Sequence, residues 1–398
     1  MRHIIGTFRR NGVLDNNCDI DRKFENERLR HAGESLKVLG DTYRELDMLR
    51  KDAKISRGRD AAVSQLYDMS DVFNEYSGAR CEKVTISGKK YTRLTLAMHR
   101  RGISADNITL VKKRDKYYEV SLNAKIVKTS CATAKELADI ISVCLERRFI
   151  PDEASRHVIN REFNRYVFIE EAPYRTIHGV ARCKKSESDV SGDNFSVCTP
   201  DSIRTVMCLS DGMGSGRIAN CESEIMIELM ERFMEAGFME TTAIKMINLA
   251  FATENYNARP LTMDVAVIDR YNGQMKLIKL GAAPTFIKRA NTKDVEIVYS
   301  SSMPAGVFER ADIEETSTSL SDGDMVIMVS DGIIDAIKSD NKEEYLQGMI
   351  AAMEVSNPKI FADRLLRGVT LNSDMIKDDM TIITTGIWSR DTKNLILT

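Results

Sequence analysis

The chain has 398 residues, of which 43% are hydrophobic, so it is long enough for two or three domains with apolar cores. The net charge of −2 is uneven: residues 80–150 hold 16 Lys and Arg against 7 Asp and Glu, a local charge of +9 that leaves about −11 elsewhere. We interpret the basic stretch as the solvated face of a small domain and expect no nucleic-acid partner.

The cysteines and the apolar runs indicate the cellular compartment in which the protein is expected. The eight cysteines lack C-x-x-C spacing and a companion Cys/His set, which predicts free thiols in a reducing compartment. No apolar run approaches the roughly 18 residues of a membrane span, and residues 1–13 lack the apolar core of a signal peptide. We therefore expect a cytoplasmic protein without zinc.

Residues 1–78 are predicted to form a helical regulatory or dimerisation segment. A long helix begins near Asp21, and its apolar positions from Leu29 to Leu46 alternate spacings of three and four over about three heptads. A second helix is expected from about Asp60 to Tyr76. The apolar seam suits a homodimerising coiled coil and a helix packed on its own protein equally well. We expect this segment to regulate the domain that follows, and a static dimerisation or packing helix is the equally open alternative.

Residues 79–165 are predicted to be a small α/β domain. Ile108–Lys113 and Tyr117–Leu122 alternate apolar and polar residues around a charged turn, which indicates a β-hairpin. Ala134–Leu145 has the apolar spacing of an amphipathic helix. The pattern of Tyr91–Leu96 is compatible with a helix and with a strand.

Residues 166–398 are predicted to form an α+β domain in which pairs of helices separate runs of strands. This order favours antiparallel sheets flanked by helices over a regular βαβ alternation. The expected strands are Tyr174–Ala181, Val206–Ser210, Met263–Asp269, Gln274–Leu280, Thr285–Lys288, Val295–Tyr299, Met325–Ser330 and Met380–Trp388, and the expected helices are Ile218–Met234, Ala243–Ala252, Tyr345–Glu354 and Pro358–Gly368.

Three of these strands meet acidic residues at one end. The strand Val206–Ser210 runs into Asp211-Gly212, Met325–Ser330 runs into Asp331-Gly332, and Asp378-Asp379 precedes the last strand. An isolated Asp-Gly pair is commonly only a turn. If the strand ends are neighbours, however, their carboxylates repel one another unless a cation lies between them.

The residue types available after His178 restrict the chemistry. No histidine follows it, the cysteines there show no nucleophile motif, and Ser210 lacks a G-x-S-x-G elbow. The acids Asp193, Asp211, Asp331, Asp378 and Asp379 offer an all-oxygen site, which suits Mg²⁺, Mn²⁺ or Ca²⁺. Two such ions about 3.5–4 Å apart activate water at neutral pH and neutralise a phosphoryl group under attack.

The motifs in order carry a family resemblance. They are Ser191-Gly192-Asp193, Asp211-Gly212-Met213-Gly214, Met263–Asp269, Gly281–Arg289, Met303-Pro304-Ala305-Gly306, Ser330-Asp331-Gly332 and Asp378-Asp379-Met380-Thr381. Residues from about 168 to 388 resemble the phosphatase domains of the stage II sporulation protein E family, a bacterial branch of the PP2C-type metal-dependent Ser/Thr phosphatases. More weakly, the preceding residues resemble the family's cytoplasmic regulatory region.

The resemblance implies a fold and a set of ligands. The fold would be a PP2C-like α/β/β/α sandwich, preceded by the long regulatory helix and the small α/β domain. Asp211 would bridge two Mn²⁺ or Mg²⁺ ions, the Gly212 carbonyl would contribute a ligand, and Asp331 and Asp378 would complete the set. Asp193 would lie beside the metal waters, and Asp379 would be structural, although the choice between Asp378 and Asp379 stays open.

One departure from eukaryotic PP2C enzymes is informative. Met213 stands where those enzymes have a histidine, so protonation of the leaving group would fall to water. The resemblance also implies a phosphorylated STAS-type anti-anti-sigma factor as substrate, whose dephosphorylation activates a sigma factor in sporulation. Relatives are anchored by N-terminal membrane spans, so the chain would contact a membrane only through an anchor outside it.

Two other functions are compatible with the sequence. A pseudophosphatase would use the helices and the small domain as a binding scaffold, and the intact acidic set argues against it. A general metal-dependent phosphohydrolase would act on small phosphate esters. Surface loops would decide between a protein and a small-molecule substrate, and their sequences carry no readable code.

Overall fold

The computed structural model describes isolated positions between residues 33 and 73 and then residues 81–390, apart from 114–116, 128–130, 153–154, 187–189, 202, 213–216, 237, 255–260, 301, 306–312, 314, 355–356 and 372–374. By its internal contacts the chain divides into two compact units, Met1–Arg80 and Cys81–Thr398. Most of the predicted helices before residue 78, as well as Met213 and Gly306, lie outside the described residues.

The first part of the second unit is a five-stranded antiparallel sheet with strand order β1-β2-β3-β7-β5, accompanied by two helices and a two-stranded sheet. Its elements are β1 (Cys81–Val84), α3 (Gly88–Arg100), β2 (Ile103–Lys113), β3 (Tyr117–Ile126), β4 (Ala132–Thr133), α4 (Ala134–Leu145), β5 (Phe149–Pro151), β6 (Val158–Ile159) and β7 (Asn164–Glu170).

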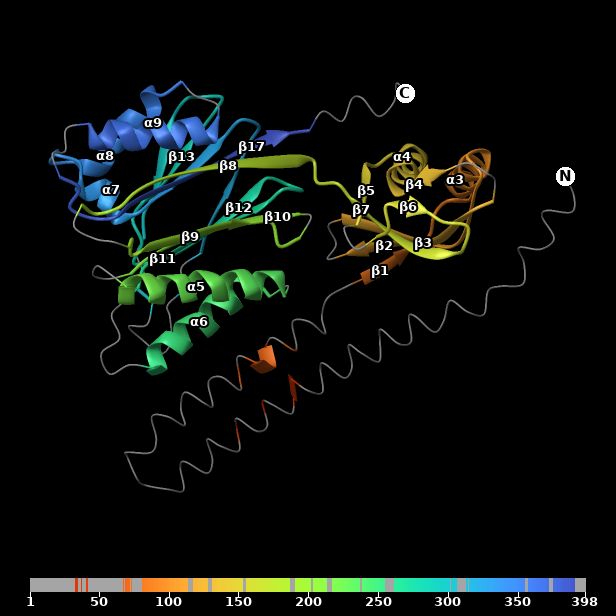
Figure 1. Cartoon of the computed structure of the whole chain (residues 1–398), viewed down its shortest axis with the longest axis horizontal. Helices are drawn as coiled ribbons and strands as arrows, with labels where there is room; N and C mark the ends of the chain where they lie inside the picture. Colours follow the sequence, from red (N-terminus) through yellow and green to blue (C-terminus); the bar gives the residue numbers. More distant parts are fainter. Residues whose placement is uncertain are drawn as a thin grey trace, which may run out of the picture. The chain divides into compact units, whose positions relative to one another are not determined.

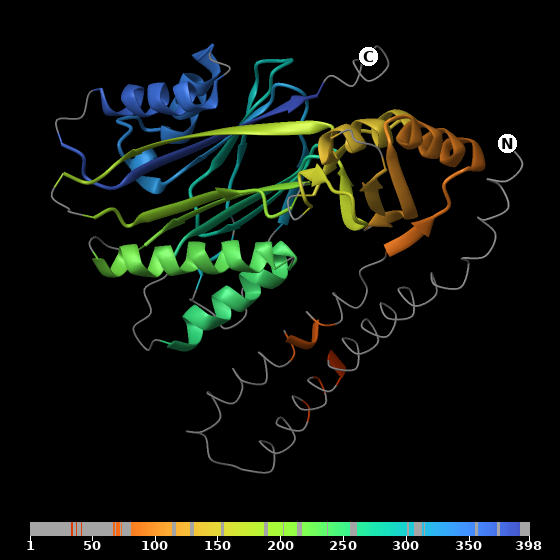
Figure 2. The same cartoon turned by 45° about the vertical axis from the view of Figure 1, so that its right-hand side comes forward.

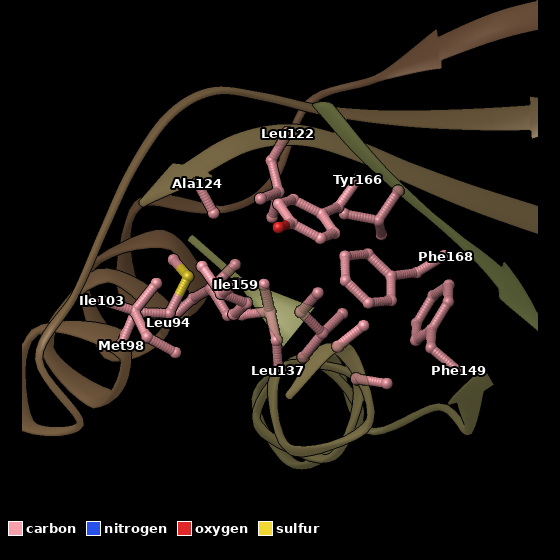
Figure 3. Packing of buried hydrophobic residues seen from close by; sticks show 14 of the residues in the cluster. Leu94, Met98, Ile103, Leu122, Ala124, Leu137, Phe149, Ile159, Tyr166 and Phe168 are labelled. Carbon is pink, nitrogen blue, oxygen red and sulfur yellow. The ribbon is translucent and has the colours of Figure 1, made fainter. Parts of the chain in front are cut away.

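Local sequence accounts for these elements. The predicted hairpin is confirmed as β2 and β3, and the predicted helix Ala134–Leu145 is confirmed as α4, which Thr133 and Glu136 begin with a reciprocal capping box. The ambiguous Tyr91–Leu96 stretch is helical, since Ser87 caps α3 and Leu94 and Met98 bury one face of it. Figure 3 shows Leu94, Leu137, Tyr166 and Phe168 packed between these helices and the sheet.

The sheet of this small domain extends further along the chain than the sequence suggests. Strand β7 pairs with β3 from Glu119 opposite Ile169 to Ala124 opposite Asn164. The domain boundary expected between residues 165 and 166 therefore falls inside a strand. The reason is physical: Tyr166 and Phe168 are fully buried in the core of the small domain, so this strand cannot belong to the domain that follows.

The remaining elements form two antiparallel sheets, with strand orders β15-β12-β11-β10-β9 and β14-β13-β16-β17-β8. The strands are β8 (Tyr174–Cys183), β9 (Asp193–Cys198), β10 (Arg204–Asp211), β11 (Met263–Asp269), β12 (Gln274–Leu280), β13 (Thr285–Lys288), β14 (Val295–Val298), β15 (Glu315–Ser319), β16 (Met325–Val329) and β17 (Met380–Ser389). The helices are α5 (Arg217–Glu235), α6 (Glu240–Glu254), α7 (Asp331–Asp335), α8 (Lys342–Ala352) and α9 (Pro358–Thr370).

Figures 1 and 2 show the two sheets as the inner layers, with α5 and α6 outside one and α7, α8 and α9 outside the other. Three apolar clusters join the four layers. One lies between the sheets around Leu209, Ile268 and Met328, and the other two join each sheet to its helices. The predicted α/β/β/α sandwich is thus confirmed.

The differences from the sequence-based elements are local. The predicted strand Met325–Ser330 ends at Val329, because Ser330 is the N-cap of helix α7, which begins at Asp331. Strand β15 was not predicted, since its five residues are polar and mostly exposed at the edge of a sheet. Among the described residues, no helix is both long and apolar enough to cross a membrane.

A close contact between β8 and α9 leads to a stability prediction. A Cβ atom at Gly179 would overlap the backbone of Pro358 and Lys359, which cannot shift without moving the helix. We expect Gly179→Ala to lower the free energy of unfolding by about 1–3 kcal/mol. Gly348→Ala is the matched control, because that helical glycine has open space around it and alanine there should stabilise by about 0.5–1 kcal/mol. Urea unfolding of both variants measures the difference, and equal stabilities would contradict this packing.

Candidate metal centre

The candidate centre begins with two acids that face each other across paired strands. Asp211 is the last residue of β10, Asp193 is the first residue of β9, and the antiparallel register places them directly opposite one another. Like charges in directly opposite positions destabilise a strand pair. Their juxtaposition therefore needs both a rigid support and a compensating positive charge.

The rigid support for Asp211 comes from the neighbouring strand and loops. Thr262 accepts a hydrogen bond from the Asp211 N–H on its Oγ1 at 3.0 Å and donates its own N–H to the Asp211 carbonyl at 3.2 Å. The Gly212 N–H donates to the Gly192 carbonyl at 3.3 Å. A side chain at Gly212 would overlap the backbone of Ala219 in α5, so only glycine lets the strand end pass this close to the helix.

Asp331 and Asp378 reach the same edge of the sandwich from the other sheet. Ser330 links the end of β16 to the start of β17: its N–H donates to the Thr381 carbonyl at 3.0 Å, and its Oγ accepts the Thr381 N–H at 2.9 Å. Gly332 allows a further close approach, because a Cβ atom there would overlap the Asp379 carbonyl oxygen. These contacts hold the two acids beside each other.

Crowding of the carboxyls shifts their proton affinities. Burial raises the pKa of Asp211 to about 10, and the charges of Asp193 and Asp331 push it in the same direction. Burial likewise raises the pKa of Asp193 to about 6. The pKa of Asp378 is raised by partial burial and by the charge of Asp331. The four acids are thus one electrostatic group, in which each negative charge disfavours the next.

The chemistry of these donors suits a hard divalent cation. Asp193 is fully buried, and neither of its carboxylate oxygens has a hydrogen-bond partner among the described residues. A buried, unpartnered carboxylate is costly unless a positive charge lies near it. In the described part of the chain, no three Asp, Glu, His or Cys side chains surround one point closely enough to hold a metal ion as they stand.

Asp379 has a different role from Asp378. Its Oδ1 accepts the Lys185 N–H at 2.9 Å, and its Oδ2 accepts the Gly192 N–H at 2.7 Å. Only 3% of Asp379 is exposed. With both oxygens used by the backbone of the loop that precedes Asp193, this side chain holds the loop, while the exposed Asp378 faces solvent and Asp331.

The structure thus brings Asp193, Asp211, Asp331 and Asp378 to one edge, as the sequence predicts. A small cavity at this edge is lined by Asp211, Asp331 and also Asp264, which the sequence analysis did not single out. A signal for it was present, since Asp264 is the only charged residue before the last position of the otherwise apolar strand β11.

Comparison with known proteins shows which proteins this chain is similar to. Residues 201–387 match the family described as Stage II sporulation protein E (SpoIIE). The curated stage II sporulation protein E of Bacillus subtilis (strain 168) is 26% identical over 332 residues, which are 83% of this chain and 40% of the relative. That of Priestia megaterium is 24% identical over 379 residues, which are 94% of this chain and 64% of the relative. The chain spans less than two thirds of either relative.

A solved structure shares the fold over most of the chain. It contains the PP2C phosphatase domain and a fragment of the regulatory domain of the cell fate determinant SpoIIE from Bacillus subtilis. The match has a TM-score of 0.61 and 26% identity, and it covers 85% of this chain and 98% of that one. The fold described above is therefore the α+β fold of the PP2C phosphatases.

The two adjacent acids give a test of their roles. We expect Asp379→Asn to lower the free energy of unfolding by about 1–3 kcal/mol, because it weakens two hydrogen bonds to a buried charged acceptor. Asp378→Asn should change stability by less than about 0.5 kcal/mol, since its side chain is exposed. Chemical unfolding without divalent ions measures both. A larger loss for Asp378→Asn would reverse the assignment.

The raised pKa of Asp211 predicts a pH-dependent stability. The native state binds the proton on the Asp211 carboxyl more tightly than the unfolded chain does. The stabilisation that this proton provides is therefore lost as pH rises from the unfolded pKa of about 4 toward the native pKa of about 10. Asparagine removes this titration. In EDTA, Asp211→Asn should be more stable than the unmodified chain by about 1–3 kcal/mol at pH 8 and by less at pH 5. Thermal unfolding at both pH values checks this, and a constant difference would contradict it.

Proposed function

We propose that this chain, whose residues 201–387 match the stage II sporulation protein E family, is a metal-dependent protein serine/threonine phosphatase of the PP2C type. One observation carries the proposal: Asp193, Asp211, Asp331 and Asp378 converge from both sheets on one edge, with carboxyl groups that repel one another. Bound cations would neutralise the negative charge of these carboxyl groups and could then take part in catalysis.

The residues present fit two divalent ions, Mn²⁺ or Mg²⁺. Asp211 would bridge both, with the Gly212 carbonyl, Asp331 and Asp378 as further ligands, because oxygen donors of this kind suit hard cations. The ions, when bound, supply an activated water at neutral pH and neutralise the phosphoryl oxygens. Asp193 would hold and orient water beside them, since its buried oxygens are free to accept hydrogen bonds.

The protein's own contribution is positional. Thr262 and Gly192 fix the backbone at Asp211 and Gly212. Ser330, which precedes Asp331, is hydrogen-bonded to Thr381, which follows Asp378 by three residues, and so joins the two segments that carry these acids. Residues 179–398 contain no histidine, so no imidazole there protonates the leaving serine oxygen and water takes that role. The turnover rate in this scheme depends on how rigidly the acids are held, because misplacement of a catalytic group by about 1 Å can lower the rate about a hundredfold.

We further propose the partners that the family implies. The substrate is a phosphorylated STAS-type anti-anti-sigma factor, whose dephosphorylation activates a sigma factor in sporulation. Residues 1–78 and the small α/β domain regulate the phosphatase, and the N-terminal helices form a homodimer; the regulatory fragment in the related Bacillus subtilis structure supports the regulatory role. Free thiols at Cys131, Cys144 and the other described cysteines support a cytoplasmic location.

Phosphate release from a phosphoserine STAS-type protein tests the function. We expect activity with Mn²⁺ or Mg²⁺, loss of activity in EDTA, and weaker recovery with Zn²⁺. Loss of a residue that only supports a metal ligand typically lowers activity by roughly 10–100-fold. Asp211→Ala and Asp331→Ala each remove a proposed ligand itself, so each should reduce turnover at least that much.

The controls separate this function from its alternatives. Arg232→Ala, on the exposed face of α5, should retain turnover, since this residue forms only an exposed ion pair with Glu228. Cleavage of p-nitrophenyl phosphate without cleavage of any phosphoprotein would favour a small-molecule phosphohydrolase. Absence of metal-dependent release from both substrates would favour a binding scaffold. Full activity in a metal-free preparation would refute the two-ion scheme.

A further inference from the structure

A buried ion pair lies beside the candidate metal centre. Lys279 Nζ pairs with Asp264 Oδ2 and donates a hydrogen bond to Thr285 Oγ1 at 2.7 Å, and the Thr285 hydroxyl donates to the same Asp264 oxygen at 2.9 Å. Asp264 is 1% exposed, Lys279 4% and Thr285 0%. Burying two charges costs several kcal/mol per ion, so replacement by apolar residues is often neutral or stabilising. The stability of the sandwich alone therefore does not explain this triad.

The position of the triad relates it to the acids. Asp264 in β11 pairs with Leu209, two residues before Asp211 in β10, and with Lys279 in β12. Thr285 begins β13, which belongs to the other sheet. The triad thus joins the two sheets next to the edge at which Asp211 and Asp331 meet. A change in the hydrogen bonds of the triad would therefore affect the positions of Asp211 and Asp331.

One oxygen of the triad has no hydrogen-bond partner in the part of the chain that the structure describes. Asp264 Oδ1 is buried and makes no hydrogen bond to any described residue. Asp264 lines a cavity of about 10 Å³ together with Thr262, Ser330, Asp211 and Asp331. A cavity of this size holds about one water molecule, and its lining has the several polar partners that a buried water requires. The unpartnered oxygen and the cavity are separate observations that point to the same occupant.

We propose that Asp264 is a positioning residue of the metal centre: its Oδ1 accepts a hydrogen bond from a water molecule in this cavity and orients that water toward Asp211 and Asp331. Lys279 and Thr285 hold Oδ2 and thereby fix the direction of Oδ1. A carboxylate paired with an ammonium group only accepts hydrogen bonds, so the water donates one O–H to Asp264. Its second O–H is then available to a carboxylate oxygen of Asp211 or Asp331, and its lone pairs are available to any cation that these acids bind. The inference rests on the proposed function, because it requires a divalent ion at Asp211.

Metal affinity distinguishes this role from a structural one. We expect Asp264→Leu/Lys279→Met, which replaces the pair by apolar residues of similar size, to fold but to bind Mn²⁺ about 10–100-fold more weakly in calorimetric titration. At saturating Mn²⁺ its kcat should fall while its KM for the phosphoprotein stays unchanged, since the triad does not face the substrate. Unchanged Mn²⁺ affinity in a folded double variant would overturn the proposal.

A second set of variants decides the question if the double variant does not fold. Thr285→Val removes the hydroxyl that holds Asp264 Oδ2 and should weaken Mn²⁺ binding several-fold, whereas Thr285→Ser should restore it. Thr384→Val is the matched control: Thr384 is also fully buried, but its hydroxyl donates to the Pro358 carbonyl at 2.8 Å, away from the acids. Equal Mn²⁺ affinity for the two valine variants would refute the positioning role.

The same titration separates the two proposals. If the unmodified chain binds no Mn²⁺, the proposed function fails, and the role of Asp264 fails with it. If the unmodified chain and all the triad variants bind Mn²⁺ equally, only the role of Asp264 is refuted, and the two-ion phosphatase stands.

Discussion

The structure depends on the repulsion between carboxyl groups that the fold forces together. Asp193 and Asp211 face each other across β9 and β10, and neither can move away without breaking the strand pairing that begins with them. Asp331 and Asp378 add charge from the opposite sheet. A fold that retains this arrangement sacrifices stability at one edge, as proteins commonly do where a cation or a substrate will supply the missing interaction.

The surrounding contacts are arranged to resist that repulsion. The side-chain oxygens of Thr262, Ser330 and Asp379 accept hydrogen bonds from backbone N–H groups of the segments that carry the acids. The glycines at 212 and 332 allow these backbones to approach closely. The apolar cluster between the sheets then fixes one sheet against the other. The site is rigid because its parts come from both layers of a packed sandwich, in which small displacements are costly.

Much of the fold is readable from local patterns. The strands Met263–Asp269 and Gln274–Leu280 and the helix Ala134–Leu145 have the predicted bounds. Their signals are local: apolar periodicity marks each element, and Asn272-Gly273 forms the turn between the two strands. The polar edge strand β15 and the short strands of the small domain were missed. Their residues carry no periodicity, and pairing with a neighbouring strand alone makes them strands.

The sequence by itself predicted the family resemblance, the sandwich and the four candidate acids, because the order of the motifs and the types of residue can be read without knowing any distance. Only the tertiary structure decided that Asp211 lies between Asp193 and Asp331, that Asp379 holds a loop while Asp378 is exposed, and that Asp264 lies beside Asp211 and Asp331. The reason is that these roles depend on contacts between residues far apart in the chain, such as Asp379 with Gly192 and Asp264 with Lys279. Strand register and sheet packing create those contacts, and a linear pattern does not encode either.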